Sequence, residues 1–160
     1  MKKTVLLLAG LALASLSFAP QATAQTSNVR VSESFVRAAP AGRGAAVYMS
    51  LQGGPDRLVG VTSDAAGQVE LRETIVENGA MSTRPVGGML INPGVATRLA
   101  PGGLHIMLLN LKRPLKDGES INVTLIFERA AKATVPVPVA QSSAAVRPNV
   151  AVPGLRTGNR

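Results

Sequence analysis

Turn-forming residues interrupt the apolar segments of this sequence about every ten residues between positions 29 and 139, and this spacing strongly constrains the fold. The interruptions are Gly, Pro, Asn and Asp, and no segment between them keeps a 3.6-residue apolar period flanked by helix caps. Short runs of this kind are typical of β-strands joined by tight turns. The runs cover residues 29–32, 45–51, 58–62, 69–76, 81–86, 89–91, 96–99, 104–109, 120–127 and 133–139. The sequence therefore predicts an all-β domain, either an antiparallel sandwich or a barrel.

Two local signals refine this prediction. Asn78-Gly79 is the dipeptide typical of a two-residue hairpin turn, so residues 69–76 and 81–86 are expected to pair. Pro136 and Pro138 lie in the last run, and proline cannot donate a hydrogen bond to a neighbouring strand. The last run is therefore expected to be an edge strand.

The first 24 residues have the features of a secretory signal peptide. Lys2 and Lys3 precede an apolar stretch over residues 5–16, and Ala22-Thr23-Ala24 fits a small-residue cleavage site. No later stretch is apolar enough to span a bilayer, and the chain has no cysteine for a lipid anchor or a disulfide. A soluble exported protein, without a transmembrane segment, is expected.

The remaining chain divides into two parts. Residues 25–140 are predicted to form one β-domain, which must be held by apolar burial because no disulfide can form. Residues 141–160 have no periodicity and few large apolar side chains, which predicts a flexible tail.

The residue content disfavours two classes of function. Of 17 Lys and Arg, Lys2 and Lys3 would leave with the signal peptide, and the rest are scattered with few aromatic residues, so no nucleic-acid partner is expected. With one His, no Cys and no Gly-x-Ser-x-Gly motif, the chain lacks the parts of a hydrolytic triad and is not expected to be an enzyme. The acidic residues Glu70, Glu73 and Glu77 are interpreted as part of a solvated strand.

His105 is the only histidine of the chain, and Met107 is one of its five methionines. Both follow the turn-forming residues 101–103 and begin an apolar run, which predicts a strand leaving a turn. Residues two apart on a strand project from the same face, so His105 and Met107 are expected to lie opposite Ile106 and Leu108. An imidazole beside a thioether suits soft Cu(I). The alternative is a lone histidine beside a methionine that merely packs.

A set of motifs keeps one order and spacing over residues 29–139. The motifs are Ala45-Ala46-Val47-Tyr48, Asp56-Arg57-Leu58-Val59-Gly60, Val69-Glu70-Leu71, Met81 with Arg84-Pro85-Val86, Pro101-Gly102-Gly103-Leu104-His105-Ile106-Met107-Leu108-Leu109, Leu111-Lys112-Arg113-Pro114-Leu115-Lys116-Asp117-Gly118 and Leu125-Ile126-Phe127-Glu128. Together they resemble the periplasmic copper chaperone PCu(A)C family. The resemblance implies an antiparallel cupredoxin-like (immunoglobulin-like) β-sandwich in the periplasm. It also implies Cu(I) delivery toward the dinuclear copper site of cytochrome c oxidase, alongside a thiol-bearing copper chaperone.

The resemblance further implies a metal site with a His, a Met after ten intervening residues and, after twenty-one more, a His-x-Met pair. The last two positions fall on His105 and Met107, but the first two fall on Arg72 and Thr83. A guanidinium has no lone pair to offer, and a hydroxyl is a hard ligand for a soft ion. Arg72 also places a fixed positive charge near the site, which at about 6 Å would oppose binding of a monovalent cation by roughly 2–3 kcal/mol. A weakened site is predicted.

Met81 offers a partial replacement for the missing ligands. It lies two residues before Thr83, so on a strand it would share that face and supply a thioether. This predicts a three-ligand site of Met81, His105 and Met107, and the alternative is that Met81 packs at the rim.

Two functions stay open at this stage. The first is an exported Cu(I)-binding chaperone with a weakened site, favoured by His105 and Met107 in their full motif. The second is a metal-free β-sandwich binding module that has lost copper binding, favoured by Arg72 and Thr83.

Overall fold

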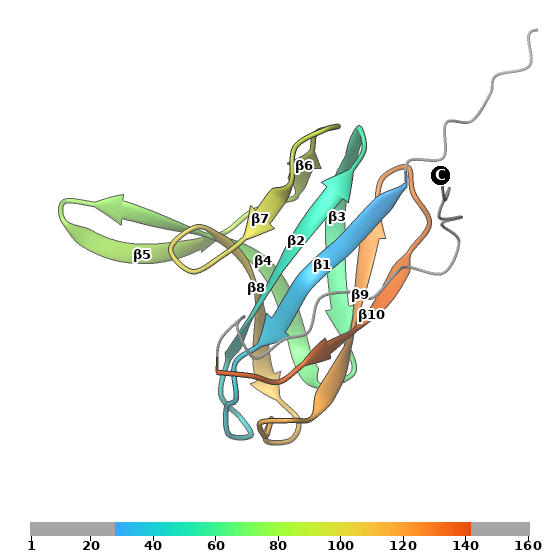
Figure 1. Ribbon diagram of the computed structural model, residues 1–160. Helices are drawn as coiled ribbons and strands as arrows, with labels where there is room; N and C mark the ends of the chain where they lie inside the picture. Colours follow the sequence, from blue (N-terminus) through green and yellow to red (C-terminus); the bar gives the residue numbers. More distant parts are fainter. Residues whose placement is uncertain (1–27, 142–160) are drawn as a thin grey trace, which may run out of the picture.

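In a computed structural model of the chain, residues 28–141 are described, and they form β-strands in two facing sheets (Figure 1). The predicted signal peptide over 1–24, and the predicted tail beyond its first residue, lie outside the described residues. The strands are β1 (Val29–Val36), β2 (Ala45–Gly53), β3 (Asp56–Ser63), β4 (Ala66–Glu77), β5 (Ala80–Pro85), β6 (Met89–Ile91), β7 (Thr97–Leu99), β8 (Leu104–Leu111), β9 (Ser120–Phe127) and β10 (Ala133–Pro138).

The first sheet has the strand order β1-β2-β8-β4-β5, and β7 also pairs with β2. The second sheet has the order β10-β9-β3-β6. Every ladder between these strands is antiparallel. The predicted all-β class is therefore confirmed, and the two separate sheets make it a sandwich and not a barrel.

Apolar side chains on the inner faces of the two sheets form the core. Val47, Ile106 and Leu108 of the first sheet and Val123 and Leu125 of the second are all 0% exposed. Burying a side chain of this size contributes about 1.5–3 kcal/mol. Because β8 alternates, the burial of Ile106 and Leu108 turns His105 and Met107 to the outer face, as the sequence predicts.

The β4–β5 hairpin is the edge of the first sheet, and its outer end projects beyond the rest of the sandwich (Figure 1). At its turn Asn78 and Gly79 have φ values of 53° and 78°, and a type I′ turn requires positive φ at both central residues. The predicted hairpin is confirmed at this turn. All six residues of β5 are exposed, so the hairpin adds little to the core.

The buried carboxylate of Asp56, only 6% exposed, ties the start of β3 to the segment after β9. Its Oδ1 accepts hydrogen bonds from the backbone N–H of Arg57 (2.7 Å) and of Arg129 (3.1 Å). Its Oδ2 accepts one from the N–H of Ala130 (2.9 Å). In the sequence Asp56 is only the last residue of a turn-forming run, so this role was not predicted.

Strand β10 ends the second sheet, where Pro136 and Pro138 pair in register with Asn122 and Ser120 of β9. The predicted edge strand is confirmed.

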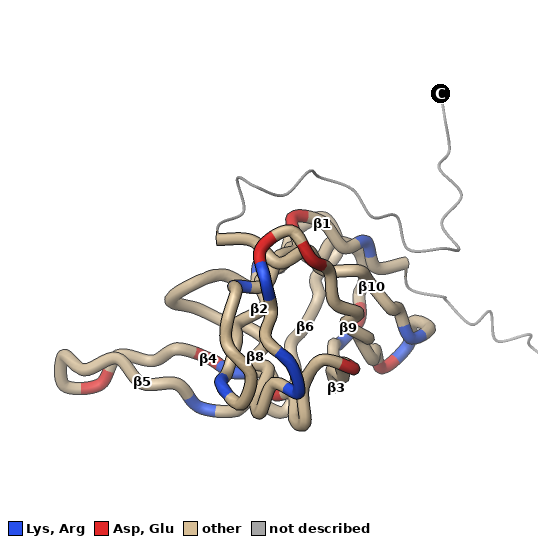
Figure 2. Tube along the Cα trace, turned by 90° about the horizontal axis from the view of Figure 1, so that it is seen from below, with Lys and Arg blue, Asp and Glu red and all other residues tan. Residues whose placement is uncertain are grey.

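Figure 2 shows basic and acidic residues interspersed along the described trace. In the part of the chain that the structure describes, no helix has the length and apolar character needed to cross a membrane.

Deleting residues 142–160 is expected to leave the melting temperature of the domain almost unchanged. Their composition offers few large apolar groups to offset the entropy of ordering a chain. Thermal unfolding of the full and shortened proteins measures the difference. A fall of more than about 5 °C, the scale of 1 kcal/mol for a domain of this size, would contradict the prediction.

Candidate metal centre

The turn between β7 and β8 sets the position of His105. Gly102 has a φ of 79°, which a residue without a Cβ adopts freely, and the N–H of Gly103 donates to the carbonyl of Ala100 (3.1 Å). The N–H of Ala100 in turn donates to the carbonyl of Leu104 (2.8 Å). The Pro-Gly-Gly segment therefore closes tightly, and His105 is the second residue of the strand that leaves it.

One carbonyl fixes the imidazole of His105. Nδ1 lies 3.0 Å from the carbonyl oxygen of Gly103, and since this oxygen only accepts, Nδ1 carries the proton and donates it. The same oxygen accepts the N–H of Thr74 on β4 (3.1 Å). In the neutral ring this leaves the lone pair on Nε2, the atom through which such an imidazole binds a metal.

The Nε2 atom of His105 is accessible even though the residue is only 6% exposed. Within residues 28–141 it has no hydrogen-bond partner, and no fully buried side-chain nitrogen or oxygen there lacks one, so Nε2 reaches solvent. The ring of Tyr48 lies beside the imidazole, with ring centroids 6.5 Å apart and planes inclined by 49°. His105 thus presents one open nitrogen on a fixed ring.

Met107 lies two residues further along β8, on the same face as His105, and is half-buried. Gly44 gives it room, because a Cβ built at that glycine would lie 3.3 Å from the Cε of Met107. The structure therefore brings together an imidazole nitrogen and a thioether sulfur on one strand face. These two donors fit a soft ion such as Cu(I).

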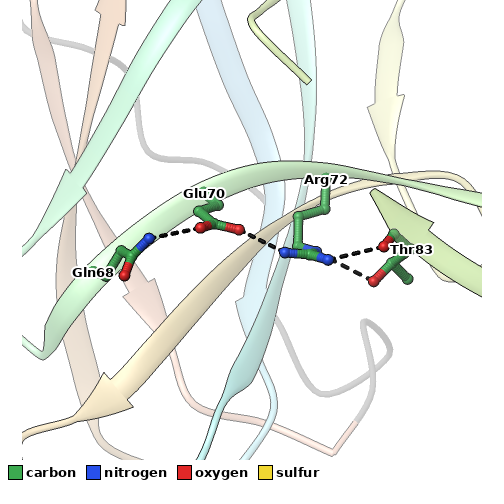
Figure 3. A network of polar contacts seen from close by, with 4 residues as sticks. All are labelled: Gln68, Glu70, Arg72 and Thr83. Atoms are coloured by element: carbon green, nitrogen blue, oxygen red, sulfur yellow. Dashed lines mark hydrogen bonds and ion pairs between the residues drawn. The ribbon is translucent and has the colours of Figure 1, made fainter. Parts of the chain in front are cut away.

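Arg72 and Thr83 lie beside this pair and contact one another. Arg72 is directly opposite His105 in the β4–β8 register, so the two side chains share a face. Its Nε donates to the hydroxyl oxygen of Thr83 (3.2 Å), and its Nη2 donates to the Thr83 carbonyl (2.8 Å) (Figure 3). The positions expected from the motif spacing to hold two further ligands are thus adjacent in space, but they bind each other.

Glu70 completes the surroundings of Arg72, and sequence reasoning assigned it only to a solvated strand. Nη1 of Arg72 donates to its Oε2 at 2.6 Å, and Nε2 of Gln68 donates to its Oε1 at 2.6 Å (Figure 3). Its spacing of two residues from Arg72 was the available signal, since such residues share a strand face. The Arg72 charge is compensated, so the repulsion of a cation is smaller than for an isolated guanidinium.

Met81 lies further out on the hairpin. It is 70% exposed and pairs with Val76, which is four residues beyond Arg72 on β4. This displaces it by roughly 13 Å along the strand from the Arg72–His105 pair. The structure brings His105 and Met107 together and places Met81 away from them, so a role for Met81 as a ligand stays a prediction.

The fold is that of a PCuAC domain. The structure is similar to the apo PCuAC domain from PmoF1 (TM-score 0.60, 27% identity, covering 70% of this chain and 92% of that one). It is also similar to the copper-bound PCuAC domain from PmoF2 (TM-score 0.57, 25% identity, 69% and 91%). The solution structure of CuI-DR1885 from Deinococcus radiodurans is a third neighbour (TM-score 0.56, 32% identity, 77% and 85%). These findings confirm the predicted cupredoxin-like sandwich.

The family follows from the sequence match. A family model described as "Putative lipoprotein LpqE-like" matches residues 29–139, and the chain belongs to this LpqE-like family. Its relative "Putative lipoprotein Lxx21020" from Leifsonia xyli subsp. xyli (strain CTCB07) is 41% identical over 124 residues, which cover 76% of this chain and 75% of the relative. "Uncharacterized protein RP573" from Rickettsia prowazekii (strain Madrid E) is 31% identical over 88 residues, 54% of this chain and 49% of that protein.

Proposed function

We propose that this protein is an exported, non-enzymatic copper chaperone that carries Cu(I) on His105 and Met107 at a weakened site. The observation that carries the proposal is the pairing of these side chains on the outer face of β8, with Nε2 of His105 open to solvent. Imidazole and thioether ligands suit Cu(I), and copper here is cargo to be passed on. Two solved neighbours, the PCuAC domain from PmoF2 and CuI-DR1885 from Deinococcus radiodurans, are copper-bound.

The weakening follows from the ligand count at this site. Arg72 and Thr83 stand where two more soft or borderline ligands would complete the site, and they are engaged with each other. Two protein donors, or three if the hairpin bends to bring Met81 in, hold an ion less tightly than four. A weaker site suits passing copper to a partner that binds it more strongly.

The location and the partners belong to the same proposal. The basic and apolar start of the sequence, and the lipoprotein names of the family and of one relative, support export to the periplasm. There we propose that the protein supplies copper toward cytochrome c oxidase, together with a thiol-bearing copper chaperone.

An anaerobic titration with Cu(I) against a competing chelator tests the proposal. One Cu(I) is expected to bind per chain, and His105→Asn should weaken binding at least tenfold. The asparagine amide keeps a donor near the Gly103 carbonyl while the metal-binding nitrogen is lost. Met107→Leu should also weaken binding, because leucine keeps the packing volume without the sulfur.

Met81→Leu in the same titration decides the predicted third ligand: a tenfold loss would support it, and an unchanged affinity would contradict it. Full retention of affinity in His105→Asn would contradict the proposed site. A chain that binds no Cu(I) would instead favour the second candidate, a metal-free binding module. The contact between Arg72 and Thr83, which occupies two ligand positions, is the observation that favours this alternative.

A further inference from the structure

Two opposite charges lie next to each other on the outer face of β4. Nη1 of Arg72 is 2.6 Å from Oε2 of Glu70, and each side chain is 23% exposed. Charges that are partly buried in this way are screened less by salt than charges on an open surface. The pair therefore acts on its immediate neighbours on the sheet.

Those neighbours are the two proposed copper ligands. In the β4–β8 register Glu70 lies directly opposite Met107, and Arg72 lies directly opposite His105. The Cβ atoms of directly opposed residues are about 5 Å apart. A cation held between His105 and Met107 thus lies beside both residues of the ion pair, so attraction by Glu70 offsets repulsion by Arg72.

Glu70 is held in place for this role by its other oxygen. Oε1 accepts a hydrogen bond from Nε2 of Gln68 at 2.6 Å, and this amide adds no charge (Figure 3). Since a carboxylate oxygen is a hard ligand that suits Cu(I) poorly, Glu70 acts through its charge and not as a ligand.

We propose that Glu70 is the positioning and charge-compensating residue that lets the site accept a monovalent cation in spite of Arg72. This inference rests on the proposed function, because it concerns the same site. It explains how His105 and Met107 can still bind Cu(I) although Arg72 stands at a position where the family spacing expects a ligand.

Charge variants of the full chain, titrated with Cu(I) at low ionic strength, test the inference. Glu70→Gln should weaken binding about tenfold, because the charge of Arg72 is then uncompensated. Arg72→Gln should strengthen it by a similar factor, and the double variant should return to within about threefold of the parent. Structural damage would lower affinity in both single variants, so the opposite signs separate charge from folding.

Glu73→Gln is the matched control. Glu73 is also an acidic residue of β4 paired with an arginine, at 3.1 Å from Nη2 of Arg84, but it projects from the other face of the strand. The Cu(I) affinity of Glu73→Gln should stay within about twofold of that of the parent, since the charge of Glu73 lies away from the site.

Salt dependence and the melting temperature without metal give two further readouts. Raising the salt from about 20 mM to about 500 mM should restore only part of the affinity lost in Glu70→Gln, because a partly buried charge is incompletely screened, while the parent should change little. Melting temperatures of the metal-free parent, the two single variants and the double variant form a double-mutant cycle. The cycle gives the interaction free energy between Glu70 and Arg72, which should be favourable and small for a partly exposed pair.

The outcomes separate this inference from the proposed function. A parent chain that binds no Cu(I) overturns the proposed function and the inference with it. A parent chain that binds Cu(I), while Glu70→Gln binds equally well or Arg72→Gln binds more weakly, overturns the inference alone.

Discussion

Replacing Arg72 with His and Thr83 with Met is expected to raise the affinity for Cu(I) at least tens-fold. The double change adds an imidazole and a thioether on strands whose register already brings these positions beside His105. It also removes the guanidinium that now binds Thr83. Loss of the Arg72 charge should supply about tenfold of this gain, as in Arg72→Gln, and the two new ligands should supply the rest. A chelator competition under anaerobic conditions measures it.

A matched pair of changes on the opposite face of the same hairpin provides the control. Glu73 and Ser82 are related to each other in the β4–β5 register as Arg72 and Thr83 are. Glu73→His with Ser82→Met adds the same two ligand types away from His105, and the affinity should then stay close to that of the parent. If the Arg72 and Thr83 double variant binds no better than the parent, those residues do not weaken the site and the metal-free module is preferred.

Replacing Asp56 with Ala should lower the free energy of unfolding by about 3 kcal/mol. The change leaves the N–H groups of Arg57, Arg129 and Ala130 without their carboxylate acceptor at a site that is 6% exposed. For a domain of this size the melting temperature should fall by roughly 10–15 °C. Thermal unfolding followed by circular dichroism measures the shift.

Two variants make the Asp56 result specific. Asp56→Asn keeps one carbonyl oxygen as an acceptor, so it should lose less stability than Asp56→Ala. Glu128→Ala removes an exposed carboxylate next to the same segment and should leave the melting temperature within about 2 °C. If Asp56→Ala is no less stable than Glu128→Ala, the three hydrogen bonds do not hold the segment after β9.

The strands were predictable because turns and alternation are local properties of the sequence. β6 and β9 lie at the predicted residues, and the Asn78-Gly79 turn adopts the conformation that its residue types favour. The order of the strands was not predictable, since it depends on pairings between distant segments. The pairing of β7 with β2 is one such case. β7 has only three residues, and a run this short does not indicate which strand it will pair with.

For the candidate site, the sequence could predict which residues share a strand face. Alternation placed His105 and Met107 together, and the family spacing placed Arg72 and Thr83 near them. The ion pair of Arg72 with Glu70 was missed because three acidic residues in one segment are compatible with solvation as well as with pairing. Asp56 was missed for a related reason: two of its three partners are backbone groups more than seventy residues away, and backbone groups have no signature in a sequence.

The hairpin that carries Thr83 has a consequence for how this family can diverge. Every residue of β5 is exposed, so an exchange there removes almost no apolar contact from the sandwich. His105, by contrast, stands on a strand in which Ile106 and Leu108 are fully buried. Residues of β5 can therefore change beside the proposed site at little cost in stability, whereas changes on β8 would alter the core as well.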